Sequence, residues 1–365
     1  NTSASSELST ESRSRESERN NKKVRRMNNL RVAVLAMYGF YGYYLAIFNP
    51  LSEPVFKGVY GLSPAQIKQT VGNVNMLFSL GALTATLVSG PISEKIGRKR
   101  LVILYDIGAF ATACSYWFKD LLLLQVLRFL GGFFGAGAGV VSAILITEII
   151  PKKQSGVANT SLFAAMTGMI TVAYIQQNIF TQSQILQYWQ YILCWPAIFI
   201  LLKVLLMPLV LPTESPKFFI KKNYDKPDLR EKLQKMYSHT YRESQTFNIA
   251  DSCIKVYTQQ QKASVIENDG EEKACAELRN LTGEYSRKRL LSGLVVAFSQ
   301  QICGVSFFAL YSTDLFNRIS GKGKQVTFFL AISKILGGLF AVIFMKAFGR
   351  KFNFHIGILT QCLSI

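Results

Sequence analysis

A series of long apolar segments, separated by short basic turns, is the feature that most constrains this chain. The segments fall at about residues 30–51, 70–92, 101–118, 121–147, 156–180, 188–211, 290–313 and 325–345, and a further one begins near residue 354. Crossing the roughly 30 Å hydrocarbon layer of a bilayer takes about 20 helical residues. Backbone polar groups in lipid must be satisfied within the segment, and the alternation of a barrel strand is absent. We therefore predict membrane-spanning helices.

Charged residues lie mostly outside these segments. Lys and Arg exceed Asp and Glu by 41 to 22, and the excess gathers in an N-terminal tail, a central loop and the short turns. Cations that flank membrane helices mark the cytosolic side, and the basic turns follow the second, fourth, sixth and eighth segments. We expect a multi-pass protein of the plasma membrane or an internal membrane with a cytosolic N-terminus. Arg318, Lys322 and Lys324 are the exception on the outer side.

The composition argues against several other classes of protein. Charge segregated in this way favours lipid headgroups over nucleic acid as the partner of the cations. The 6 cysteines contain no Cys-x-x-Cys pair, and only His239 and His355 accompany them, a set that does not suit a metal cluster. Because no Ser/His/Asp or Cys/His arrangement is present either, we expect neither an enzyme nor a cofactor.

The segments divide the chain into four parts. Residues 1–29 are too polar to fold and form a disordered cytosolic tail, and residues 30–211 form an N-terminal bundle of six helices. Residues 212–289 form a cytosolic connector with short amphipathic helices at 228–236 and 271–281. Residues 290–365 begin a C-terminal bundle with helices 7, 8 and part of 9, so we expect a fragment that lacks the last helices.

Five short motifs occur at particular places relative to these segments. The turn from Gly90 to Arg100 reads GPISEKIGRKR and partly returns as FGRK at 348–351; RFLGGFFG begins at Arg128, EIIPK at Glu148, PTESPK at Pro212 and QQICG at Gln300. In this order the motifs resemble those of the sugar-porter branch of the major facilitator superfamily. The resemblance covers residues 30–365 and implies an all-α polytopic membrane helical bundle of two six-helix halves, the second truncated.

The resemblance also implies a charge network at the cytosolic face, which in this family latches the two bundles together and breaks as the protein opens inward. Gly97 permits the tight turn that the network needs. The carboxylates and cations expected to form it are Glu94, Glu148 and Glu214 with Arg98, Lys99, Arg128 and Arg350. The alternative is that the cations only anchor to anionic lipid and set the topology. Ser155 replaces a usual arginine and Lys346 a usual acid, which predicts a thinner or rewired network.

The seventh segment carries the candidate solute site. Its polar and aromatic side chains lie on or beside one helical face, and the members that we expect to bind solute are Gln300, Gln301, Ser306 and Tyr311. Paired amides suit the hydroxyls of a sugar, and the resemblance implies that these residues are sugar contacts. The alternative is that they hold neighbouring helices together.

Three positions depart from the sugar-contact pattern of the family, namely Leu162, Ser306 and Lys334, and they argue against a plain hexose. A cation at the centre of a membrane helix costs about 2.5–3.5 kcal/mol on insertion scales, so it usually faces a cavity or a partner. We expect Lys334 to face the central cavity and to favour a solute with a carboxylate or phosphate. The alternative is a pair with an acid in the helices that the chain lacks. For Lys203, the other lysine at membrane depth, snorkelling explains part of the placement.

The first helix lacks the acid of proton-coupled sugar porters. Those proteins place it after Gly-Tyr, whereas here Gly42 and Tyr43 are followed by Tyr44. Asp106 is the remaining acid inside the N-terminal bundle, and we expect it to pair with a cation of the basic turn. The sequence therefore favours facilitated diffusion, and strongly pH-driven transport would instead make Asp106 the candidate.

Together these features predict a secondary transporter that moves a small polar solute, a sugar or sugar-like compound, by alternating access. We expect it to be a monomer whose partners are the solute and the lipid bilayer. Two alternatives stay open, an organic-anion transporter that uses Lys334 and a non-transporting nutrient sensor on the same fold. Saturable solute flux would separate a transporter from a sensor.

Overall fold

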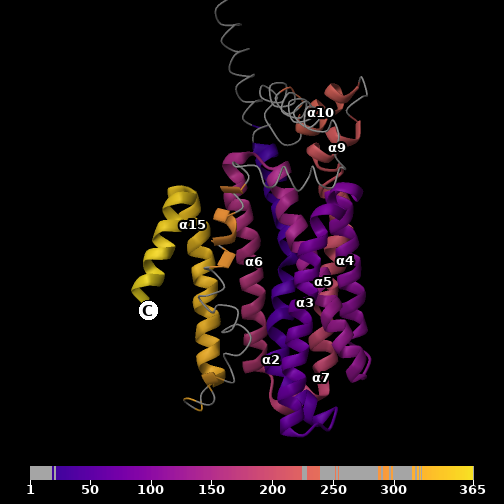
Figure 1. Cartoon of the computed structure of the whole chain (residues 1–365), viewed down its shortest axis with the longest axis vertical. Helices are drawn as coiled ribbons and strands as arrows, with labels where there is room; N and C mark the ends of the chain where they lie inside the picture. The colour runs from indigo at the N-terminus through magenta and orange to yellow at the C-terminus, as the bar shows by residue number, and fades with distance from the viewer. Residues whose placement is uncertain are drawn as a thin grey trace, which may run out of the picture.

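The computed structural model describes residues 22–223, 228–238 and 323–364, with short pieces at 19, 251, 254, 287–288, 291–295, 297–298, 315–316, 319 and 321. Long helices run side by side as a bundle (Figure 1). After a first helix over residues 22–36 come η1 (Met37–Gly39), α2 (Phe40–Gly58), α3 (Pro64–Ile96), α4 (Arg98–Ser115), α5 (Leu121–Ile149), α6 (Lys152–Ile179), α7 (Gln182–Cys194) and α8 (Pro196–Val210).

Among the described residues, six helical stretches are long and apolar enough to cross a membrane: Lys22–Phe48, Pro64–Ile96, Leu121–Ile149, Gln154–Gln176, Gln182–Val210 and Gln325–Gly349. Each contains or overlaps a predicted segment. The predicted segment at 101–118 is helical up to Ser115 as α4, but α4 begins at Arg98, so four of its 18 residues are charged and lower its hydropathy. The predicted segment at 290–313 lies largely outside the described residues.

Helices α3 and α5 approach each other so closely that their backbones touch. A β-carbon on Gly132 of α5 would lie 2.0 Å from the carbonyl oxygen of Phe78, and one on Gly81 of α3 would lie 2.0 Å from that of Phe129. Only glycine fits at such a contact, which is typical of helix pairs in membranes. The pair α3–α5 therefore has a fixed separation.

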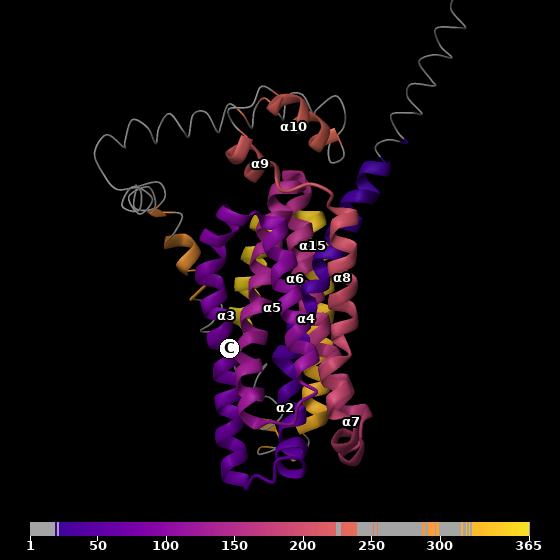
Figure 2. The same cartoon turned by 90° about the vertical axis from the view of Figure 1, so that its right-hand side faces the viewer.

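Two short helices lie beyond one end of the bundle (Figure 2). They are α9 (Pro216–Asn223) and α10 (Leu229–Ser238), and we refer to this side as the α9 end. The helix predicted at 228–236 is confirmed as α10. The helix predicted at 271–281 lies outside the described residues.

Helix α15 (Gly323–Ser364) lies along α6 on the flank of the bundle (Figure 1). The hydroxyl of Thr171 donates a hydrogen bond of 2.9 Å to the carbonyl oxygen of Ala331, which joins the two helices at a point sealed from solvent. The chain bends sharply at Gly349, where φ is 79°, so the predicted second turn at 348–351 is a kink within α15.

Candidate functional site

The turn between α3 and α4 is a single residue, Gly97. Its φ of 107° and ψ of 150° place it in a region that other residues rarely adopt. A β-carbon at this position would also lie 2.8 Å from Oε1 of Glu214. Glycine is required here for both the backbone turn and the approach of the carboxylate.

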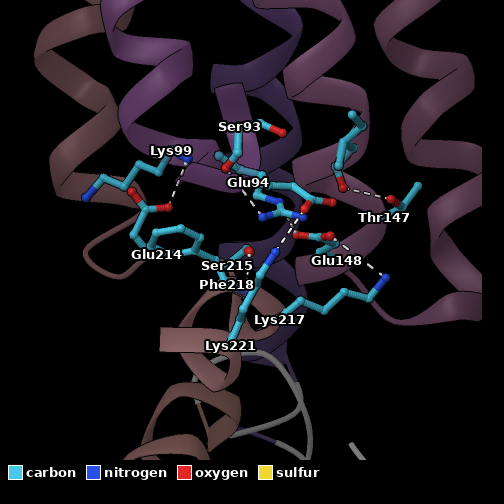
Figure 3. Close-up of polar contacts among 12 residues, drawn as sticks. Ser93, Glu94, Lys99, Thr147, Glu148, Glu214, Ser215, Lys217, Phe218 and Lys221 are labelled. Atoms are coloured by element: carbon cyan, nitrogen blue, oxygen red, sulfur yellow. Dashed lines mark hydrogen bonds and ion pairs between the residues drawn. The ribbon is translucent and has the colours of Figure 1, made fainter. Parts of the chain in front are cut away.

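Glu214 caps the first turn of α4 from a distant part of the chain. Its carboxylate accepts hydrogen bonds from the backbone N–H groups of Lys99, at 3.0 Å, and Arg100, at 3.1 Å. The N-terminal N–H groups of a helix have no partner within the helix and carry partial positive charge, so an anion is stabilised there. Figure 3 shows Lys99 and Glu214 in this contact.

Glu148, one residue before the end of α5, lies between two cations. Nε of Arg98 is 3.3 Å from its Oε2 and Nζ of Lys217 is 3.8 Å from its Oε1. The Glu148 side chain is only 5% exposed, so its charge is shielded from water. The contact with Arg98 is an ion pair without hydrogen-bond geometry, since neither joined atom has a hydrogen-bond partner.

Glu94, near the end of α3, forms a more exposed pair. Its Oε2 lies 2.9 Å from Nζ of Lys221, and both side chains are about half exposed. Exposed pairs of this kind contribute only about 0–1 kcal/mol. We call residues 212–223 the strap, because this segment reaches α3 through Lys221, α4 through Glu214 and α5 through Lys217 (Figure 3).

The structure brings together most of the predicted charge network at the α9 end. Glu94, Gly97, Arg98, Lys99, Glu148 and Glu214 all lie there. The backbone of Arg350 follows the kink of α15, and its side chain lies outside the described part of the chain. Lys217 and Lys221 take part without having been predicted as members. Lys217 closes the PTESPK motif, and Lys221 follows one helical turn later, which is the signal that would have found them.

The placement of Arg128 in this network is wrong. Arg128 and Glu148 both lie on α5, 20 residues apart, which at 1.5 Å per residue is about 30 Å. Arg128 is fully buried, with its guanidinium 4.1 Å from the ring centre of Phe48 and 4.2 Å from that of Phe78. Its Nη1 donates a hydrogen bond of 2.8 Å to the carbonyl oxygen of Tyr44. The charge is thus held by aromatic faces and a carbonyl group, and none of the ion pairs among the described residues includes it.

The predicted pairing of Asp106 with a cation of the basic turn is also wrong. Nζ of Lys203 on α8 lies 2.8 Å from Oδ1 of Asp106 on α4, and the side chains are 1% and 5% exposed. Lys203 therefore reaches across to α4 and does not extend toward the membrane surface. Both residues line a cavity of about 30 Å³ that Tyr38, Tyr41 and Tyr44 also border.

The predicted solute-binding residues are only partly described. Gln300, Gln301, Ser306 and Tyr311 lie outside the described residues. Lys334 lies on α15, half-buried, three residues after Ala331 and four before Gly338, which both approach α6. No hydrogen bond or ion pair links Lys334 to any residue that the structure describes. Within the same residues, no group of His, Cys, Asp or Glu is arranged to hold a metal ion.

The chain is similar to known transport proteins. The family model described as sugar (and other) transporter matches residues 30–365. The D-xylose transporter of Levilactobacillus brevis is 27% identical over 296 residues, which cover 78% of this chain and 59% of that protein. The solute carrier family 2, facilitated glucose transporter member 2 of Sus scrofa is 25% identical over 290 residues, which cover 77% of this chain and 52% of that protein. The chain thus spans little more than half the length of these relatives.

A solved structure shows the same fold. The major facilitator superfamily proton:xylose symporter XylE of E. coli, bound to 6-bromo-6-deoxy-D-glucose, matches with a TM-score of 0.71 at 15% identity. The match covers 91% of this chain and 71% of that one. With the family model matched over nearly all of the sequence, the chain belongs to the sugar (and other) transporter family and has the fold of the major facilitator superfamily.

Proposed function

We propose that this protein is a secondary transporter that moves a small polar solute, a sugar or sugar-like compound, across a membrane by alternating access. Membership of the sugar (and other) transporter family supports transport over catalysis. The observation that carries the proposal is the strap, a single segment joined through carboxylates to three helices of the bundle. Such ionic contacts suit a structure with two arrangements, because they can form in one arrangement and be exchanged for others in the second.

The charge network at the α9 end acts as a latch in this proposal. Glu94, Glu148 and Glu214 hold the strap and the start of α4 in the state seen here. Arg350 completes the network from α15, whose kink lies toward the α9 end (Figure 1). In this proposal, opening of the bundle at this end separates α15, with Arg350, from these contacts.

We place the α9 end in the cytosol. Exposed cations gather on that side, among them Lys23, Arg25 and Arg26 at the start of the first helix and Lys222 on α9. This excess follows the distribution that sets the orientation of multi-pass proteins. The division of the chain into a tail, a first bundle, a connector and a second bundle, at residues 29, 211 and 289, belongs to the same proposal.

The solute site of the proposal combines Gln300, Gln301, Ser306 and Tyr311 with Lys334. Amide and hydroxyl groups offer both donors and acceptors to a sugar-like solute. Lys334 supports an added preference for negative charge, because a half-buried cation at membrane depth without a partner among the described residues needs a counter-charge.

We further propose that transport is facilitated diffusion. Proton coupling needs a carboxylate that can take up and release a proton. The buried Arg128 donates to the carbonyl oxygen of Tyr44, and none of the described ion pairs joins it to a carboxylate. Asp106 is engaged by Lys203 at 2.8 Å. Neither charged centre inside the described bundle offers a free carboxylate for coupling.

Uptake into liposomes that hold the purified full-length protein tests the function. Labelled hexose and a small organic anion are compared with and without a pH gradient. Saturable hexose uptake of the same rate in both conditions supports a sugar facilitator, whereas uptake that depends strongly on the gradient contradicts facilitated diffusion. Flux of neither solute would favour a sensor on the same fold.

A further inference from the structure

Helices α4 and α8 are joined by a charged contact inside the membrane that is not part of the proposed latch. Asp106 and Lys203 are both more than nine-tenths buried, and Oδ2 of Asp106 has no hydrogen-bond partner. Removing two charges from water is costly, and an apolar pair of similar volume is often as stable or more stable. A buried ion pair is therefore better explained by the arrangement that it specifies than by the stability that it adds.

The same two helices meet again at the α9 end. Lys99 lies seven residues before Asp106 on α4 and so occupies the same helical face, about 10 Å away along the axis. Its backbone N–H donates to Glu214, which follows the end of α8 at Val210 by four residues. The pair of Asp106 with Lys203 thus joins α4 to α8 within the bundle. The contact of Lys99 with Glu214 joins α4 to the strap, which continues from α8, at the end of the bundle.

Apolar packing between these two contacts does not by itself fix the register of the helices. Leu101, Val102, Met207 and Val210 belong to one buried cluster there. Contacts among such side chains are not directional. The cavity of about 30 Å³ beside Asp106 and Lys203 also leaves α4 incompletely packed at that depth.

We propose that Asp106 and Lys203 are positioning residues that set the register of α8 against α4 and thereby place Glu214 on the first turn of α4. The ion pair is directional and joins one atom of each helix at 2.8 Å. A shift of either helix by one residue, about 1.5 Å, would lengthen this contact and bend it away from its present geometry, which opposes the shift. Loss of the pair would therefore detach the strap from α4 without touching the strap itself.

Exposure of Ser215 reports strap attachment. Ser215 is fully buried, adjoins Glu214, and its Oγ accepts a hydrogen bond from the backbone N–H of Phe218. In the full-length protein with its native cysteines replaced by serine, Ser215→Cys introduces one thiol. Its rate of reaction with a membrane-impermeant maleimide is measured in detergent, where both faces are accessible. The inference deepens the proposed latch, but this test does not measure solute flux, so the two proposals fail separately.

We expect Lys203→Met and the apolar pair Asp106→Leu/Lys203→Met each to raise the labelling rate by about tenfold, within the range of coupling between linked contacts. The exchanged pair Asp106→Lys/Lys203→Asp should restore a rate near that of the parent. Arg230→Gln, which breaks an exposed ion pair with Asp251 on the same side, is the matched control and should change nothing.

Combination with a strap variant separates positioning from general loosening. Glu214→Gln should raise the labelling rate by itself, and adding Lys203→Met should raise it little further, because both changes release the same contact. If the increase in labelling rate of the double variant equals the product of the increases in the two single variants, the proposal is overturned. So would a parental labelling rate in the apolar pair Asp106→Leu/Lys203→Met, since the ion pair would then not be needed for attachment.

Discussion

Two features exclude a side chain at Gly97. Its φ of 107° is rarely adopted by other residues, and the carboxylate of Glu214 occupies the space that a β-carbon would fill. The sequence pointed to this glycine because a one-residue turn between two helices needs an unusual φ, and the basic motif fixes its position. The motifs placed Glu214 in the same charge network, but they did not predict that its carboxylate accepts hydrogen bonds from the backbone of the first turn of α4. Arg128 was predicted to belong to this network, and its burial between aromatic rings was missed because it depends on how α2, α3 and α5 pack.

We expect Gly97→Ala to destabilise the protein by about 1–3 kcal/mol, because alanine is strained at this φ and its β-carbon meets Glu214. The shift in the thermal unfolding midpoint in detergent measures the effect. Gly90→Ala is the matched control, since a β-carbon on Gly90 meets nothing within 4 Å and the residue lies in a helix. An equal loss in both variants would contradict this account of the turn.

Lys334 gives a second prediction at the residue scale. If it serves the solute and has no protein partner, Lys334→Met should preserve or raise the unfolding midpoint, because a cation at membrane depth costs about 2.5–3.5 kcal/mol on insertion scales. The same variant should lose uptake of an anionic solute. A large fall in the unfolding midpoint would instead indicate a buried pair with an acid, and unchanged anion uptake would exclude Lys334 from the solute site.

At the scale of elements, helix positions could be predicted more reliably than helix contacts. Long apolar runs set the helices, and the basic turns set where they end. The contact of α15 with α6 could not be predicted in this way, because Thr171, Ala331 and Gly338 resemble many other small residues in membrane helices. The pair of Asp106 with Lys203 was missed for a related reason, since each residue was judged on its own helix.

The contribution of each ion pair of the strap to stability should increase with the burial of its carboxylate. We expect Glu148→Gln to cost more stability than Glu94→Gln, because Glu148 is 5% exposed between two cations and Glu94 is half exposed. Removing one partner of a fully buried pair costs about 3–5 kcal/mol, and Glu148 should approach this range while Glu94 stays near 0–1 kcal/mol. Thermal unfolding of the two variants side by side measures the difference. Equal losses would mean that burial does not decide the strength of these contacts.

At the scale of the whole molecule, the hydropathy pattern was sufficient to predict the membrane bundle, and the order of motifs was sufficient to predict its family. The predicted solute-binding residues on the seventh segment lie outside the described part of the chain and stay predictions. The bundle geometry nevertheless supports a clear expectation about orientation, since its two ends differ in charge.

We expect a membrane-impermeant maleimide to label Lys119→Cys but not Lys222→Cys in intact cells, with native cysteines replaced by serine. Both positions are exposed, and they lie at opposite ends of the bundle, on the loop before α5 and on α9. Permeabilisation should make Lys222→Cys reactive. Labelling of Lys222→Cys in intact cells would place the α9 end outside and reverse the proposed orientation.

The touching backbones of α3 and α5 have a consequence for how the strap is released. Glu94 and Glu148 lie near the ends of these two helices, about 20–24 Å along the axes from the glycine contact, so the strap binds to two helices that are held together elsewhere in the bundle. Lys217 and Lys221 lie one turn apart on α9, so the strap is attached at two points, to Glu148 on α5 and to Glu94 on α3. While one pair holds, the other re-forms at high effective concentration, and dissociation of the strap becomes a single cooperative event.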